Sequence, residues 1–179
     1  MLLHDLRYEK IKDAVVQMYE ECNVHCTPIN GFEIATHLGI SVCAYSALSS
    51  MQRAAAMKLS EDGFHVLKNG RYIIYYNDEC SSGRINNTII HELGHIRLGH
   101  VQESELAEAE AKFFAKFALA PPVLIHKLGL QSCYEVMERF EISYKAACIA
   151  WSYYTLWQSR HFAYTEQEMK TCRLFGFAV

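Results

Sequence analysis

The sequence predicts an α+β fold in which a small, mostly antiparallel sheet precedes a run of helices. Residues 40–45, 64–68 and 71–76 are rich in β-branched and aromatic side chains, which favours strands. Asn69-Gly70 between the last two segments is typical of a hairpin turn. From residue 85 onward the sequence is almost wholly helical in pattern. We therefore expect an antiparallel meander over residues 55–77, joined to the strand near residue 42.

Two helices are expected before the sheet. Ile11, Val15 and Met18 recur at helical spacing and predict an amphipathic helix over about residues 4–22. Asn30 precedes a short second helix as a capping residue, and Gly39 ends it.

Four helices are expected after the sheet. They cover about residues 85–98, ended by Gly99; 104–119, stopping before a Pro-Pro pair; a short one to 140; and 143–158. Ser132 and Ser143 are the expected capping residues of the last two. We expect a core of residues 1–122 and a helical C-terminal lobe of residues 123–179, packed together as one unit.

Composition excludes several classes of protein. The chain has 179 residues, 51% of them hydrophobic, which suits one domain with a sizeable core. A formal charge of -3 without a long basic run argues against binding to nucleic acid. The absence of a signal-like or membrane-length apolar run predicts a soluble, cytoplasmic protein. The seven cysteines, including Cys22 and Cys26, are interpreted as reduced thiols and not as metal ligands.

The segment His91-Glu92-Leu93-Gly94-His95 carries the chemistry. Two histidines four residues apart on a helix point the same way, so both imidazoles can bind one zinc ion. Glu92, next to the first histidine, can hold a metal-bound water and take its proton. This pattern predicts His91 and His95 as metal ligands and Glu92 as the catalytic base.

A catalytic zinc site needs a third protein ligand. The candidates are His100 and a cluster of glutamates in and just before the next helix: Glu103, Glu105, Glu108 and Glu110. His100 directly follows Gly99, which is the wrong spacing for the extended motif with a third histidine, so it is expected near the site or on the surface. Glu108 can pair with Lys112 on an outer face, where Glu105 also lies. Glu110 falls in the apolar stripe, where a charge must be paired or bind metal, and is the predicted ligand.

The motif and the segments after it resemble the ImmA/IrrE family of metallopeptidases. Glu110-Ala111 with Phe114-Ala115, before Pro121, is similar to the family's Glu-Ala-Asn-x-Phe-Ala stretch. Phe140-Glu141-Ile142-Ser143 with Ala146 is similar to its Phe-x-Val-Ser-x-x-Ala segment, and the likeness covers about residues 28–157. Lys112 replaces the usual asparagine, and Ala118 and Ala120 replace larger apolar residues.

The resemblance implies a zincin-like fold and a zinc peptidase of phages or mobile elements. It implies His91, His95 and Glu110 as ligands of one zinc ion, Glu92 as the catalytic residue, and a helix-turn-helix repressor as the protein substrate. We expect the substrate to lie extended along the sheet edge near residues 73–77.

Two other functions compete with the peptidase. A zincin fold can bind a regulator without cleaving it, as an anti-repressor or a toxin–antitoxin component, although the intact Glu92 argues against this. The helices at 132–140 and 143–158 also resemble a helix-turn-helix. The second of them has Lys145 as its only basic residue and many aromatic ones, so no direct DNA contact and no membrane contact are expected.

Overall fold

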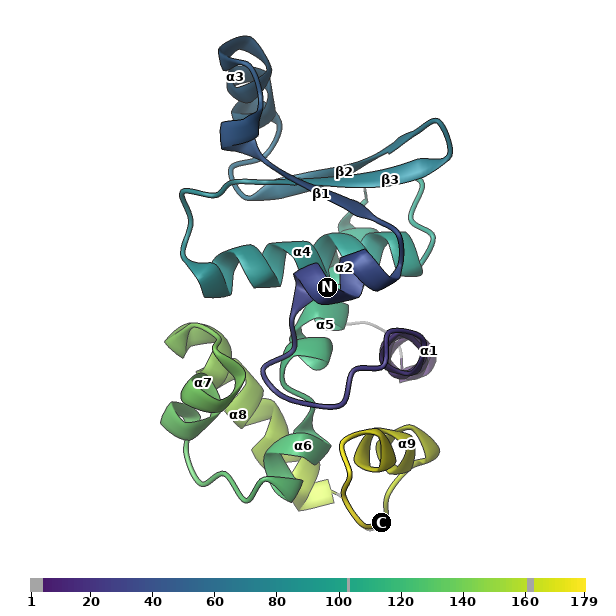
Figure 1. Cartoon of the computed structure of the whole chain (residues 1–179). Helices are drawn as coiled ribbons and strands as arrows, with labels where there is room; N and C mark the ends of the chain where they lie inside the picture. Colours follow the sequence, from purple (N-terminus) through teal and green to yellow (C-terminus); the bar gives the residue numbers. More distant parts are fainter. Residues whose placement is uncertain (1–4, 103, 161–162) are drawn as a thin grey trace.

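The sheet and the helical part of the chain meet at one central helix. The computed structural model describes residues 5–102, 104–160 and 163–179. The sheet lies along one side of α4 (Ser82–Arg97), and α5 (Glu105–Leu119) lies on the other, above the C-terminal helices (Figure 1). The α+β prediction is confirmed, and the layers suit a zincin-like fold.

The sheet has three strands in the order β1-β3-β2: β1 (Ser41–Ala44), β2 (Gly63–Lys68) and β3 (Arg71–Tyr76). β2 and β3 form the predicted antiparallel hairpin over six residue pairs. β1 joins the other edge of β3 in parallel over four pairs, so the sheet is mixed and its longer pairing is antiparallel.

The predicted meander is wrong in its first part. Residues 55–59 belong to the helix α3 (Ser50–Leu59), which follows a short 3-10 turn, η1 (Tyr45–Ala47). Ser49 and Gln52 form a reciprocal capping box at the start of α3, and an alanine run follows them. Strong capping and alanine's high helix propensity explain why a helix forms here.

The helices near the motif follow the predicted signals. α1 spans Asp5–Glu21, and α2 spans Gly31–His37, with Asn30 accepting hydrogen bonds as its N-cap. α4 ends just before Gly99, whose φ of +69° suits glycine at a helix terminus. The Ser104 hydroxyl caps α5.

The C-terminal part contains two helices that the sequence patterns did not predict. These are α6 (Pro122–Lys127) and α9 (Glu166–Leu174); the predicted pair is α7 (Cys133–Phe140) and α8 (Tyr144–Arg160). Buried residues of α1, α4, α5, α8 and α9 belong to one hydrophobic cluster. None of the described helices is long and apolar enough to cross a membrane.

Packing fixes α4 firmly between the sheet and α5. Ile89, Ile90 and Leu93 are fully buried. Gly94 lies against Phe114 of α5, so close that a Cβ at this position would be 3.0 Å from the ring. At the other end of α4, the Asn86 amide bonds to the backbone of Ile29 and Gly31 at the start of α2. The motif side chains therefore start from a rigid element.

Candidate metal centre

His91 and His95 lie one turn apart on α4 and converge as the motif predicts. Their Nε2 atoms are 3.1 Å apart, and their rings meet edge to face. Both nitrogens point toward α5. This geometry follows from the helical repeat, which places residues i and i+4 on the same face.

Glu108 of α5 completes a group of three potential ligands with these histidines. Its Oε1 lies 3.0 Å from Nε2 of His95, and its Oε2 lies 3.7 Å from Nε2 of His91. Donor atoms in a tetrahedral zinc site, about 2 Å from the ion, are roughly 3.3 Å from one another. The spacing and the donor types fit a zinc ion held by two imidazoles and one carboxylate.

Glu110, the predicted third ligand, is not brought to the histidine pair. Residues two apart on a helix differ by about 200° in direction, so Glu108 and Glu110 lie on opposite sides of α5. Glu110 is the more buried of the two, with 13% of its side chain exposed against 40% for Glu108. Its charge is compensated by Arg7 and His100. On α5 the buried carboxylate is thus the paired one, and Glu108 is the carboxylate that lies near the two histidines.

His100 approaches His95 from the rear. Its Nδ1 lies 3.0 Å from Nδ1 of His95, which is the ring nitrogen that faces away from Glu108. Its Nε2 lies 2.9 Å from Oε2 of Glu110. His100 therefore supports His95 and does not belong to the ligand group.

Glu92 is buried beside the ligand group and is held by a residue that sequence reasoning missed. Nδ1 of His65, on β2, lies 2.7 Å from Oε2 of Glu92. Side chains alternate along a strand, and Gly63, two residues before His65, also faces α4, against Thr88. The sequence could have indicated this contact, because His65 falls on the side of β2 that faces α4.

Burial and neighbouring charges tune the ligand group. Burial lowers the pKa of His95, and the nearby His91 lowers it further, which favours the neutral imidazole that a metal requires. Burial acts to raise the pKa of Glu108, but His91, His95 and Lys112 outweigh it and the pKa is lowered. The site thus favours neutral nitrogen donors beside an ionised carboxylate.

The ligand group opens into a cleft of about 590 Å³. The cleft is lined by α4 and α5 residues and by Gly63, Phe64 and His65 of β2. The predicted substrate position along residues 73–77 is wrong, because β3 is the central strand and both of its edges are paired. β2 is the edge strand that borders the cleft.

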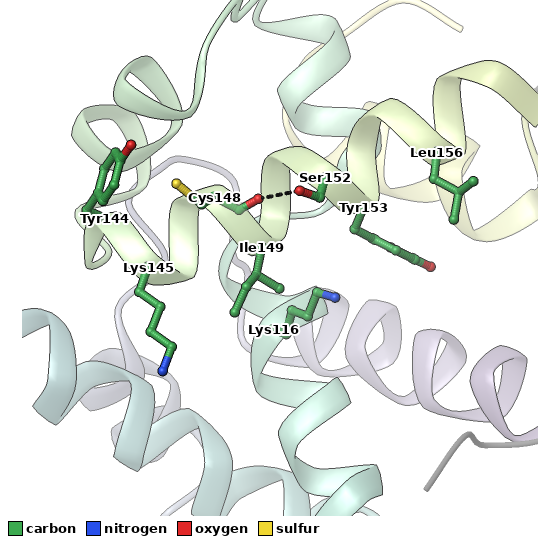
Figure 2. A pocket seen from close by; sticks show the side chains of 8 residues that line it. All are labelled: Lys116, Tyr144, Lys145, Cys148, Ile149, Ser152, Tyr153 and Leu156. Atoms are coloured by element: carbon green, nitrogen blue, oxygen red, sulfur yellow. Dashed lines mark hydrogen bonds between the residues drawn. The ribbon is translucent and has the colours of Figure 1, made fainter.

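A second hollow, of about 740 Å³, lies on α8 away from this cleft. Figure 2 shows its lining: Tyr144, Lys145, Cys148, Ile149, Ser152, Tyr153 and Leu156 of α8, with Lys116 of α5. The Ser152 hydroxyl donates to the Cys148 carbonyl and is thereby satisfied. The described lining residues offer neither a carboxylate nor an imidazole, so this hollow is not a candidate catalytic site.

The fold and the site define a class, the zincin-like metallopeptidases. Residues 35–152 match a peptidase family model described as the IrrE N-terminal-like domain, and the chain belongs to this family. The match spans the sheet, α4, α5 and the first half of α8, and it confirms the family suggested by the sequence. No curated protein matches the chain.

Proposed function

We propose that the chain is a zinc-dependent endopeptidase. The observation that carries this proposal is the convergence of His91, His95 and Glu108 next to the buried carboxylate of Glu92, at the floor of an open cleft. These are the parts that metal-assisted hydrolysis of a peptide bond requires. The peptidase family to which the chain belongs supports the same reaction.

Each residue has a distinct role in the proposed reaction. His91, His95 and Glu108 would hold one zinc ion, which supplies an acidified water and polarises the scissile carbonyl when bound. Glu92 takes the proton from the attacking water and later delivers it to the leaving amine. His65 contacts Oε2 of Glu92 and leaves Oε1 for the water. Burial leaves little of the Glu92 side chain in contact with bulk water.

The substrate chain is proposed to lie along β2. This strand is paired on one side with β3, and its other edge borders the cleft. An extended peptide can add to such an edge through main-chain hydrogen bonds, which do not depend on its side chains. The scissile bond would then lie over Glu92 and the ligand group.

An intracellular helix-turn-helix repressor of a phage or mobile element is our proposed substrate, through the likeness to the ImmA/IrrE family. The proposal is tested by incubating the zinc-loaded protein with a repressor encoded next to its gene. We expect two repressor fragments with the wild type, none with Glu92→Gln, and unchanged cleavage with Glu105→Gln, a variant of an exposed glutamate on α5. Glu92→Gln should keep stoichiometric zinc, because Glu92 is not in the ligand group.

Two results would reject the peptidase. Cleavage by Glu92→Gln at the wild-type rate would exclude the proposed base. A stable complex of wild-type protein and repressor with both chains intact would indicate the rival function, an anti-repressor that binds without cleaving.

A further inference from the structure

A row of polar side chains extends from the rear of His95 to the protein surface. His95 Nδ1 contacts Nδ1 of His100 at 3.0 Å, and His100 Nε2 contacts Oε2 of Glu110 at 2.9 Å. The other oxygen of Glu110 accepts a hydrogen bond from Arg7 of α1. The row thus joins α1, α5 and the loop after α4 behind one member of the ligand group.

The end of α4 places His100 in this row. The His100 amide donates to the carbonyl of His95, and the Gly99 amide donates to Ile96. This is the Schellman arrangement, which brings the second residue past the helix end back against the residue five positions earlier. An apolar contact is common between those two positions, but here two imidazoles meet. The contact between His95 and His100 thus follows from the helix terminus and not from the spacing of the motif.

With His100 as a neutral imidazole, the hydrogen bonds in the row have one direction. A guanidinium is always charged and only donates, so the carboxylate of Glu110 accepts at Oε1. An ionised carboxylate also accepts at Oε2, so the donor there is Nε2–H of His100. A neutral imidazole carries one proton, which leaves Nδ1 of His100 as an acceptor for Nδ1–H of His95. The lone pair of His95 is then on Nε2, which faces His91 and Glu108.

We propose that Arg7, Glu110 and His100 are positioning residues that fix the tautomer and the ring orientation of His95 for metal binding. This inference rests on the proposed function, because it takes the ligand group to be a zinc site. A partner on the far nitrogen of a ligating histidine orients the ring and raises its basicity. In this chain that partner is a second imidazole, backed by a carboxylate and a guanidinium from other elements.

Zinc affinity, measured by competition with a chromophoric chelator, gives the first test. His100→Phe keeps an aromatic ring but removes both nitrogens, and Glu110→Gln removes the charge. We expect each to weaken zinc binding about 10-fold or more, the usual cost of losing such a partner. The double variant should lose no more than the worse single one, because the two residues act in series. Glu105→Gln is the matched control on α5 and should bind zinc like the wild type.

Arg7→Met tests the outer end of the row at an exposed side chain. Lys10→Met, at another exposed position of α1, is its control. We expect Arg7→Met to weaken zinc binding and Lys10→Met to leave it unchanged. Wild-type affinity in all three variants at positions 7, 100 and 110, or strictly additive losses in the double variant, would overturn the inference.

Nitrogen-15 NMR of the imidazoles in the metal-free protein gives the second test, which does not depend on zinc. We expect the proton of His100 on Nε2, toward Glu110, with the His100 tautomers becoming mixed in Glu110→Gln. A wild-type His100 that carries its proton on Nδ1 alone would refute the positioning role. Failure of the wild type to bind any zinc would instead refute the proposed function, so the two failures are distinguishable.

Discussion

The two sides of His95 show how one helix uses two carboxylates for different purposes. On the cleft side Glu108 is partly exposed, lies 3.0 Å from Nε2 of His95, and pairs with Lys112. On the rear side Glu110 is more buried and contacts His95 only through His100. The carboxylate nearer solvent is the one available to a metal. The more buried one is already neutralised, so burial of a charge does not by itself identify a ligand.

The strongest way to break this comparison is to remove Glu108. Glu108→Gln keeps the shape but cannot supply an anionic oxygen next to the two imidazoles. We expect zinc affinity to fall by more than the roughly 10–100-fold that outer partners of a ligand cost, and cleavage to be lost with it. Chelator competition measures the affinity. If Glu108→Gln bound zinc as tightly as the wild type while Glu110→Gln did not, the assignment of the two sides would be reversed.

A second variant separates the effect on the proposed base, Glu92, from the effect on metal binding. His65→Phe keeps a ring on β2 but removes the nitrogen that holds Glu92. We expect kcat for a cleavable substrate to fall about 10- to 100-fold, at the low end of what general base catalysis contributes, with zinc affinity unchanged. His37→Phe, on the exposed side of α2, is the control. An equal loss of zinc affinity in His65→Phe would show that the residue acts on the metal site instead.

The sequence predicted those parts of the molecule that depend on local signals. Asn30 and Ser132 accept hydrogen bonds at helix starts, as their residue types indicated. The motif placed His91, Glu92 and His95 because four residues make about one helical turn. α3 was missed because its alanine-rich sequence lacks a clear apolar stripe, although its capping box was readable.

The carboxylate that joins the two histidines and its surroundings depend on contacts between elements far apart in the sequence. Arg7 is 103 residues from Glu110, and His65 is 27 residues from Glu92. A helical-face argument shows which side of α5 is apolar, but not that a guanidinium from α1 is present to neutralise a charge there. It therefore could not separate Glu108 from Glu110.

The contacts on both sides of His95 depend on the distance between α4 and α5. Gly94 allows the two helices to approach closely. An added Cβ would lie 3.0 Å from the fully buried ring of Phe114. Overpacking should cost about 1–3 kcal/mol, and the higher helix propensity of alanine should return at most about 1 kcal/mol, so we expect Gly94→Ala to destabilise the metal-free protein by about 1–2 kcal/mol. Urea unfolding measures this change. A variant more stable than the wild type would show that α5 can move away without cost.

The smallest expected effect is the pH dependence that Glu110 adds to folding. Burial acts to raise the pKa of this carboxyl, but Arg7 and His100 outweigh it, so the pKa lies below its usual value of 4.5. A carboxyl with a depressed folded-state pKa stabilises the fold above its unfolded-state value, and this contribution is lost as the pH falls through the folded-state pKa. Because Arg7 is half exposed, we expect the contribution to be about 1 kcal/mol or less. Urea unfolding of the metal-free protein between about pH 7 and 3 should show a shallower loss of stability in Glu110→Gln than in the wild type or Glu105→Gln. Parallel profiles for all three proteins would mean that the rear pair is not formed in solution, and the contrast between the two carboxylates would then rest on Glu108 alone.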